Sequence, residues 1–365
     1  MNSLNFLPIN TSQFPRPSPW VLVTGKIRDE ASLSHRFEFL GNLKKSGLVE
    51  QVVFSTWVGE LERHPEIFGQ VVENGFLTVE STEPKVVAGG HYLHQIVQLT
   101  NGLEACSPRS FILRTRTDKC GPEAGFIEEQ IVSLLSRQTH TRRCGGNLPR
   151  FQFKIGLPGY HNYLSEIAPL LFWWNDRLYF GLREDLQKFL NFNVLSLSFL
   201  DLIPEQTLFT HPFRERSSVF RQFFSAFPQG QIANKVYWAA DKHSIQYRTL
   251  IDFLKQNTLF KLALLLERYL LHTHFFDLSS GEDIPYATEF AGEAMLQASD
   301  YEELRFGESL LQDDFSIDLG REAESAKSFL LSNWDIHSPT RRESREDMIS
   351  RRFFVTPDEH LSIRS

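Results

Sequence analysis

The segment Ser110-Phe111-Ile112-Leu113-Arg114-Thr115-Arg116-Thr117-Asp118-Lys119 is the clearest guide to the architecture of this chain. Its first half is apolar and favours β structure, and its second half is polar and runs to the carboxylate of Asp118. Such a run predicts a buried strand that carries Asp118 to the carboxyl edge of a sheet, where open α/β proteins bind their ligands. The Cys-Gly-Pro sequence at 120–122 predicts a turn directly afterwards. The alternative is a strand that merely ends in solvated charges.

Strand and helix patterns alternate over the hundred residues before this segment. Short apolar runs predict strands at 20–24, 51–55 and 76–79, and apolar residues recurring every three or four positions predict helices over about 29–46 and 91–105. Asp29 or Ser32 can cap the first helix, and Gly47 can end it. Connections of this length imply right-handed crossovers, so the pattern predicts an α/β fold with a mainly parallel sheet.

The composition of the 365 residues is that of an ordinary globular protein, with 41% hydrophobic and 23% charged residues. A net charge of −7 argues against a nucleic-acid partner. Cys106, Cys120 and Cys144 fit neither a disulfide framework nor a zinc pattern, which favours a reducing compartment. The most apolar run, 259–271, is too short and too charged to span a bilayer. We therefore expect a cytoplasmic protein without a membrane span, with peripheral association at the inner membrane face as the alternative.

The later part of the chain is less regular. Residues 1–19 are proline-rich and predict an extended lead-in, and 136–150 read as a polar surface loop. The run 169–185 places aromatic residues on both sides of Asp176 and predicts strand, turn and strand, followed by a helix from about Glu184 to Phe192. Residues 249–272 have the pattern of a buried helix or helix pair. The polar residues 299–365 predict a partly exposed appendage with an arginine-rich tail.

Several short motifs occur in a coherent order along residues 20–272. They are Val23-Thr24-Gly25, Ser55-Thr56-Trp57-Val58-Gly59, Gln95-Ile96, Gly102-Leu103, Arg116-Thr117-Asp118, Asn175-Asp176 with the aromatic residues and Gly181 that follow, and Glu267-Arg268-Tyr269-Leu270. Together they resemble the WavE-type lipopolysaccharide-synthesis family, a family of glycosyltransferases with a GT-A-like fold. The chain departs from that pattern at His94, where the family commonly has Arg, and at Asn175 and Arg177, where it has Ser and an aromatic residue.

This resemblance covers residues 20–272 and implies a GT-A-like, Rossmann-like domain there. Residues 273–365 lie outside it, and we expect them to form a helical C-terminal extension with a partly exposed tail. It implies transfer of a sugar from a nucleotide-sugar donor to a glycan or glycolipid acceptor, a precursor of lipopolysaccharide or capsule type. The motif positions expected to bind the donor are Thr24, Gly25, Thr56, Trp57, Gln95, Arg116 and Asp118. Those expected to bind the acceptor are Trp174 and Asp185, with a helix cap as the alternative role of Asp185.

The chemistry of such a transfer suggests roles for the acidic residues. Asp118 could hold Mg²⁺ or Mn²⁺, which would also bind donor phosphate oxygens, whereas Arg116 could meet the phosphates directly and reduce the need for a metal. An inverting transfer needs one base behind the acceptor oxygen, and Asp176 is the first candidate and Glu267 the second. Trp57 should border the nucleotide by stacking or by shaping the wall, or else simply close the core.

Two other interpretations stay open at the level of sequence. A catalytically degenerate GT-A-like domain could serve as a scaffold or as a carbohydrate-binding protein, because aromatic rings around a carboxylate also suit sugar binding. An α/β nucleotide-binding protein unrelated to sugars is the other alternative. The N-terminal half of the chain, which has the alternating strand and helix pattern, contains neither a Gly-x-Gly-x-x-Gly turn nor a Walker phosphate loop.

Overall fold

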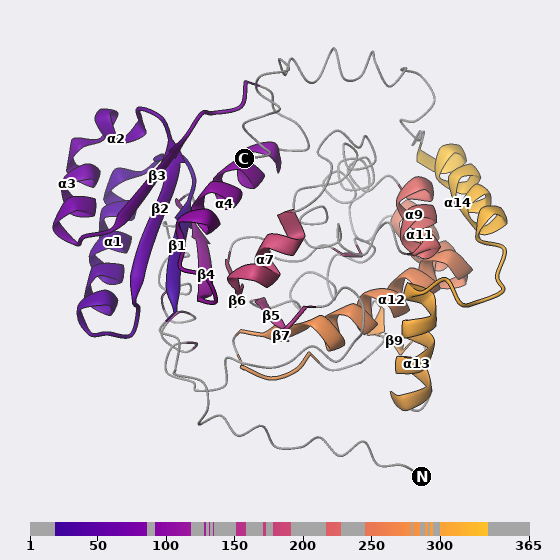
Figure 1. Ribbon diagram of the computed structural model, residues 1–365. Helices are drawn as coiled ribbons and strands as arrows, with labels where there is room; N and C mark the ends of the chain where they lie inside the picture. Colours follow the sequence, from indigo (N-terminus) through magenta and orange to yellow (C-terminus); the bar gives the residue numbers. More distant parts are fainter. Residues whose placement is uncertain are drawn as a thin grey trace, which may run out of the picture.

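The computed structural model describes much of the chain, drawn as coloured ribbon in Figure 1. The described residues are 19–85, 92–117, 128, 131, 134, 151–157, 171–172, 178–190, 217–227, 245–278, 280–284, 289–290, 293–294 and 300–334.

The first part of the chain forms four parallel strands joined by helices. The strands are β1 (Trp20–Thr24), β2 (Gln51–Trp57), β3 (Leu77–Ser81) and β4 (Phe111–Arg116). The helices are α1 (Glu30–Lys45), α2 (Glu60–Arg63), α3 (Pro65–Glu73) and α4 (Tyr92–Ala105). The predicted β-α-β order is confirmed, because apolar runs bounded by turn residues became strands and the periodic segments became helices.

Caps fix the ends of α1 as its sequence predicts. Asp29 is the N-cap, and its side chain accepts a hydrogen bond from the backbone N–H of Ser32. Gly47, just past the end of the helix, adopts φ 76°, a left-handed conformation that glycine reaches without a steric penalty.

The later strands extend the same sheet. β6 (Leu178–Leu182) pairs antiparallel with β4, and beyond it lie β5 (Ile155–Leu157) and β7 (Phe275–Asp277). The sheet has seven strands in the order β3-β2-β1-β4-β6-β5-β7, and β6 runs opposite to the other six. This mixed, mostly parallel sheet with helices is compatible with a Rossmann-like fold. It continues to Asp277, past the domain boundary expected at residue 272. β8 (Glu289–Phe290) and β9 (Glu293–Ala294) pair separately.

Each face of the sheet has its own hydrophobic core. Alternate residues of β1 point to opposite faces, so Val21 and Val23 pack with α1 and α3, whereas Leu22 packs with α4. In Figure 1, α1 and α3 cover one face and α4 and α7 (Arg183–Leu190) lie on the other side. Burial on both faces explains why β1, β2 and β4 read as continuous apolar runs.

A group of helices extends the core on the α4 side. It contains α9 (Ser218–Ala226), α11 (Ile245–Gln256), α12 (Thr258–His274), α13 (Asp300–Leu311) and α14 (Leu319–Trp334). The segment 249–272 is a helix pair, because Asn257 ends α11 and caps α12 by accepting a hydrogen bond from Phe260 N–H. Leu310 and Leu330 are buried in the same core as Leu22.

One local prediction was wrong. The first of the two strands predicted within 169–185 was expected at residues 170–174, but the two described residues of that run, Leu171 and Phe172, lie in a turn. Phe172 has φ 62°, which no strand residue adopts, and both side chains are buried. The strand of this region is β6, which α7 follows directly, one residue earlier than expected.

Candidate functional site

The carboxyl edge of the parallel strands contains a topological switch point. β1 lies between β2 and β4, and the chain builds outward to β3 before it returns to the other side of β1 as β4. In open α/β sheets, ligands bind in the space outside the carboxyl ends of the strands at such a point. The residues that follow β1 and β4 therefore form the candidate site, and those that follow β2 and β3 adjoin it.

The loops after β1 and β4 are in direct contact. Gly25 has φ 138° and donates its N–H to Ser55 O at 3.1 Å. A Cβ atom at this position would lie 2.2 Å from Thr117 Oγ1, so only glycine fits here. Thr117 Oγ1 in turn donates to Lys26 O at 2.8 Å. The glycine of the Val-Thr-Gly motif thus allows the two loops to touch, which is a structural reason for its presence.

Arg114 ties three elements together beneath this edge. Its side chain is 1% exposed, and Nε donates to Thr24 Oγ1 of β1 at 3.1 Å. Nη2 reaches Gln95 Oε1 of α4 at 3.4 Å, and the guanidinium lies 5.2 Å from the ring centroid of Tyr179 on β6. Sequence reasoning missed this residue, although a charged residue inside a segment predicted to be buried was a usable signal, because buried arginine requires partners.

A second buried arginine lies on the opposite face of β4. Arg36 of α1 is fully buried, and its Nη1 donates to Thr115 Oγ1 at 3.3 Å. Its Nε lies 3.6 Å from Glu128 Oε1, so Glu128 offsets the charge of this buried guanidinium. The end of β4 therefore has a guanidinium group against each of its faces.

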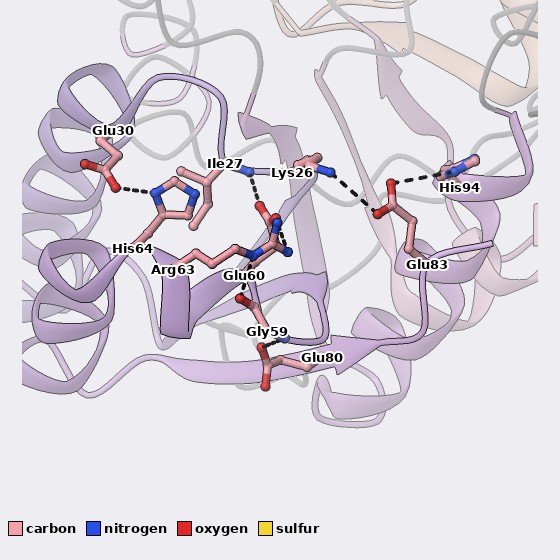
Figure 2. Close-up of polar contacts among 10 residues, drawn as sticks. All are labelled: Lys26, Ile27, Glu30, Gly59, Glu60, Arg63, His64, Glu80, Glu83 and His94. Atoms are coloured by element: carbon pink, nitrogen blue, oxygen red, sulfur yellow. Dashed lines mark hydrogen bonds and ion pairs between the residues drawn. The ribbon is translucent and has the colours of Figure 1, made fainter. Parts of the chain in front are cut away.

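A carboxylate anchors the loop after β1 from the β2 side. Figure 2 shows Glu60, the first residue of α2, facing the backbone of Ile27. Glu60 Oε2 accepts from Ile27 N–H at 2.9 Å, and Oε1 lies 2.7 Å from Arg63 Nη2. Gly59, the α2 N-cap with φ 78°, donates its N–H to Glu80 Oε1 at 3.2 Å. These contacts hold α2 over the start of α1.

Charged residues at the rim of this edge form looser contacts. Lys26 Nζ lies 3.6 Å from Glu83 Oε2, with both side chains 43% exposed, and His94 Nε2 lies 4.0 Å from Glu83 Oε1. His64 Nδ1 contacts Glu30 Oε1, which links α3 to the first turn of α1. The exposed Lys26–Glu83 pair contributes little stability.

The start of α1 already carries negative charge. Asp29 accepts hydrogen bonds from Ser32 N–H at 3.1 Å and Ser32 Oγ at 2.7 Å. These bonds, the side-chain one first, hold the pKa of Asp29 below its ordinary value. With Glu30 and Glu60 beside it, this helix N-terminus is unfavourable for a phosphate group, in contrast to the helix N-termini of dinucleotide-binding folds.

The structure brings several predicted donor residues to this edge. Thr24, Gly25, Gln95 and Arg116 lie there, and Thr24 and Arg116 are direct partners in the β1–β4 register. Thr56 and Trp57 end β2 and are buried at 0% and 3% exposure, as is Thr24 at 1%. The Trp57 ring meets the His94 ring edge-on, with centroids 5.6 Å apart. This placement favours the interpretation in which Trp57 closes the core. Stacking of Trp57 on a nucleotide stays a prediction.

Two other motif positions have packing roles. A Cβ on Gly102 would lie 2.6 Å from Leu22 Cδ1, so this glycine lets α4 lie close to the sheet. Ser55 Oγ donates to Gln98 O of α4 at 2.8 Å.

One predicted residue, Asp185, lies away from the carboxyl edge. Asp185 is three residues past β6, whose last residue, Leu182, pairs with Phe111 at the start of β4. A strand rises about 3.3 Å per residue, which separates this end of β4 from the carboxyl end by about 16 Å. The buried Asp185 carboxylate accepts from Gln152 and Phe153 N–H at 2.9–3.0 Å and pairs with Lys188. The structure therefore gives it a role in holding the start of β5.

Glu267 lies deep in α12. Its side chain is fully buried, and Oε1 accepts a hydrogen bond of 2.5 Å from Phe172 N–H. This bond fastens the turn at Phe172, whose φ of 62° would otherwise be unfavourable. The described contact is therefore a backbone anchor, whereas a general base must face the acceptor hydroxyl.

Asp118, Trp174 and Asp176 lie outside the described residues. In the sequence, Asp118 follows Arg116 by two residues and Asp176 precedes Leu178 by two. Leu178 at the start of β6 pairs with Thr115 near the end of β4.

The described residues alone do not make up a metal site. Within the ranges that the structure covers, no group of three His, Cys, Asp or Glu side chains is placed to hold a cation. Glu60 is occupied by Ile27 and Arg63. In the same ranges, no helix has the length and apolar character needed to cross a membrane.

In comparisons with known proteins, no family model matches the sequence, and no significant match was found among curated proteins or solved structures.

Proposed function

We propose that this protein is a nucleotide-sugar-dependent glycosyltransferase of GT-A-like fold. It would transfer a sugar to a cell-surface glycan precursor of lipopolysaccharide or capsule type, acting in the cytoplasm, free or at the inner membrane face. One observation carries the proposal. Arg114 joins Thr24 and Gln95, which belong to separate motifs of the family resemblance, directly below Arg116 at the switch point of the sheet.

The charges of this edge favour a donor whose phosphates lie near the end of β4. Arg114 and Arg36 pack against the two faces of that strand, whereas Asp29, Glu30 and Glu60 surround the start of α1. In this proposal Arg116 and Asp118 meet the diphosphate, Asp118 either directly or through Mg²⁺ or Mn²⁺.

The acceptor side of the proposal rests on Asp176 as general base, with Trp174 beside the acceptor sugar. Asp176 stands two residues before Leu178 in the sequence, and Leu178 pairs with Thr115 near the end of β4, which supports this role. Glu267, the second candidate, has the weaker case because its carboxylate bonds to the backbone of Phe172.

A binding protein without catalysis is the second candidate function. It is favoured by the engagement of described acidic side chains with protein groups, as at Glu60, Asp185 and Glu267. A sugar-binding or scaffold protein would need no free base. Release of free sugar and nucleotide from the donor in the presence of Mn²⁺ would favour the enzyme.

Thermal stabilisation by nucleotide sugars tests the proposal. UDP-, GDP-, CMP- and dTDP-sugars are added singly, with and without Mn²⁺, and the melting temperature is recorded. A donor at about 100 times its Kd stabilises the native state by about 2.7 kcal/mol, which raises Tm by about 2 °C or more.

Asp118→Asn is the matched variant for this screen. It keeps the size and shape of the side chain and removes only its charge, so we expect the ligand-free melting temperature to change little and the donor-dependent rise to be lost. If no nucleotide sugar at millimolar concentration moves Tm of the unmodified protein, the proposed function is wrong. A variant that responds as the unmodified protein does would remove Asp118 from the site.

A further inference from the structure

We propose that Glu60 is a positioning residue for donor binding. Its buried carboxylate holds the loop Gly25–Ile27 and, through that loop, the start of the segment that carries Asp118. The inference rests on the proposed function for its effect on donor affinity, but its effect on the loop can be measured without any ligand.

The carboxylate of Glu60 is in an environment that requires partners. The residue is 0% exposed, and an unpaired buried carboxylate would be strongly unfavourable. Oε2 accepts from Ile27 N–H at 2.9 Å and Oε1 lies 2.7 Å from Arg63 Nη2. A charged acceptor forms a stronger hydrogen bond than a neutral one, so the Ile27 amide is held firmly.

The helix that carries Glu60 is itself fastened to the sheet and to α1. With four residues, α2 cannot be stable alone. Val58 N–H donates to Ser81 O at 3.0 Å and Gly59 N–H to Glu80, which attaches the start of α2 to β3. At its other end His64 contacts Glu30. Glu60 therefore projects toward Ile27 from an anchored support (Figure 2).

The loop transmits this position to the other side of the switch point. Lys26, the neighbour of Ile27, accepts through its carbonyl from Thr117 Oγ1 at 2.8 Å. Gly25 abuts the same threonine. The loop is thus held by Glu60 from the β2 side and by Thr117 from the β4 side, and Asp118 follows Thr117 directly. If the Ile27 amide is held less firmly, we expect increased motion of Thr117 as well, at the end of β4 that is proposed to bind the donor.

Three variants of the full chain separate positioning from simple packing. Glu60→Gln keeps an oxygen acceptor for Ile27 but removes the charge, Glu60→Asp keeps the charge but is shorter by one methylene, and Glu60→Ala removes both functions. Glu62→Ala is the control, because Glu62 is an exposed glutamate in the same turn. The readouts are hydrogen exchange of the Ile27 and Thr117 amides without ligand, and the Kd of the nucleotide sugar found in the thermal screen.

We expect Glu60→Ala to lose amide protection and nucleotide-sugar affinity, and Glu60→Gln to keep both. Leaving a buried N–H group without its hydrogen-bond acceptor changes an equilibrium constant by a factor on the order of 10 or more. Glu60→Ala and Glu60→Asp should therefore speed hydrogen exchange at both amides and raise the Kd of the nucleotide sugar by roughly 10-fold. Glu60→Gln should stay within about threefold of the unmodified protein, and Glu62→Ala should match it.

Two outcomes would overturn the proposal. Unchanged exchange at Ile27 and Thr117 in Glu60→Asp would show that the carboxylate does not hold the loop. Faster exchange with unchanged donor affinity would leave Glu60 a purely structural residue. If Glu60→Ala does not fold, Glu60→Asp and Glu60→Gln provide the comparison. If the unmodified protein binds no nucleotide sugar, the proposed function fails by itself, and the exchange rates still decide whether Glu60 controls Thr117.

Discussion

Asp29 at the start of α1 makes the stability of this helix depend on the charge of one carboxylate. Hydrogen bonds from Ser32 favour the ionised form and lower the pKa of Asp29 in the folded protein. The folded state therefore binds the proton less readily than the unfolded state does. The stabilising contribution is present above the unfolded pKa and is lost as pH falls through the lower, folded value.

This sign gives a prediction at the scale of one residue. Asparagine is also a good N-cap but does not titrate and lacks the charge that favours a helix N-terminus. The unmodified protein should therefore melt above Asp29→Asn at pH 7, and the difference should shrink as pH falls below about 4. Asp29→Ala, which has no cap at any pH, should melt below both. Melting curves of the three proteins between pH 3 and pH 7 are the measurement, and a constant difference between the first two would refute the assignment.

At the scale of elements, the approach of α4 to the sheet depends on the absence of a side chain. An alanine Cβ at position 102 would lie 2.6 Å from Leu22 Cδ1 and 3.2 Å from Ser55 Cβ. Leu22 and Ser55 belong to two buried strands, so either the Leu22 side chain must repack or the helix must shift to make room. Such a shift would also move Gln95, which meets Arg114 from the same helix.

Gly102→Ala should therefore destabilise the protein by about 1–3 kcal/mol, the usual effect of overpacking a core. Gly69 in α3 is the matched control, because a Cβ there meets nothing within 4 Å. Gly69→Ala should stabilise by about 0.5–1 kcal/mol through better helix propensity. Urea unfolding of both variants provides the two free energies. Equal effects of the same sign would contradict the close packing of α4.

At the scale of the molecule, the C-terminal helices belong to the core of the sheet. Leu310 of α13 and Leu330 of α14 share one hydrophobic cluster with Leu22 of β1. Gly307 lets α13 lie against Tyr269 of α12, since a Cβ there would be 2.6 Å from Tyr269 Cβ. Burial raises the pKa of Tyr269 to about 12, and Glu308 adds to the shift. Because α13 and α14 share their buried contacts with the sheet, we expect these helices to unfold together with it.

Leu330→Ala tests this cooperativity. The side chain is 1% exposed, so its loss should cost about 2–5 kcal/mol and lower the melting temperature of one calorimetric transition. Leu331→Ala is the control, because Leu331, the next residue of α14, is 47% exposed and its truncation should change stability by no more than about 0.5 kcal/mol. Two separate transitions, with only the smaller one shifted by Leu330→Ala, would instead make α14 part of an independent unit.

Short-range features of this chain were readable from its sequence. The strands β1, β2 and β4, the helix α1 with its Asp29 cap and Gly47 end, and the pair α11 and α12 follow from apolar periodicity and capping chemistry. Parts of the site were readable for the same reason, since Thr24, Gly25 and Arg116 directly end or follow strands whose carboxyl ends meet at one edge. The strand expected at 170–174 failed because an apolar run does not reveal a left-handed residue such as Phe172.

The long-range contacts were decided by the tertiary structure alone. No local pattern predicts that β6 runs antiparallel between β4 and β5. This direction places Asp185 near the amino ends of the parallel strands, opposite the carboxyl edge. Arg114 and Thr24 are 90 residues apart, and Glu60 and Ile27 are 33 apart. Their partners depend on strand order and on the faces that helices cover. Periodicity determines which side of an element is buried, whereas the packing of the whole chain determines what that side meets.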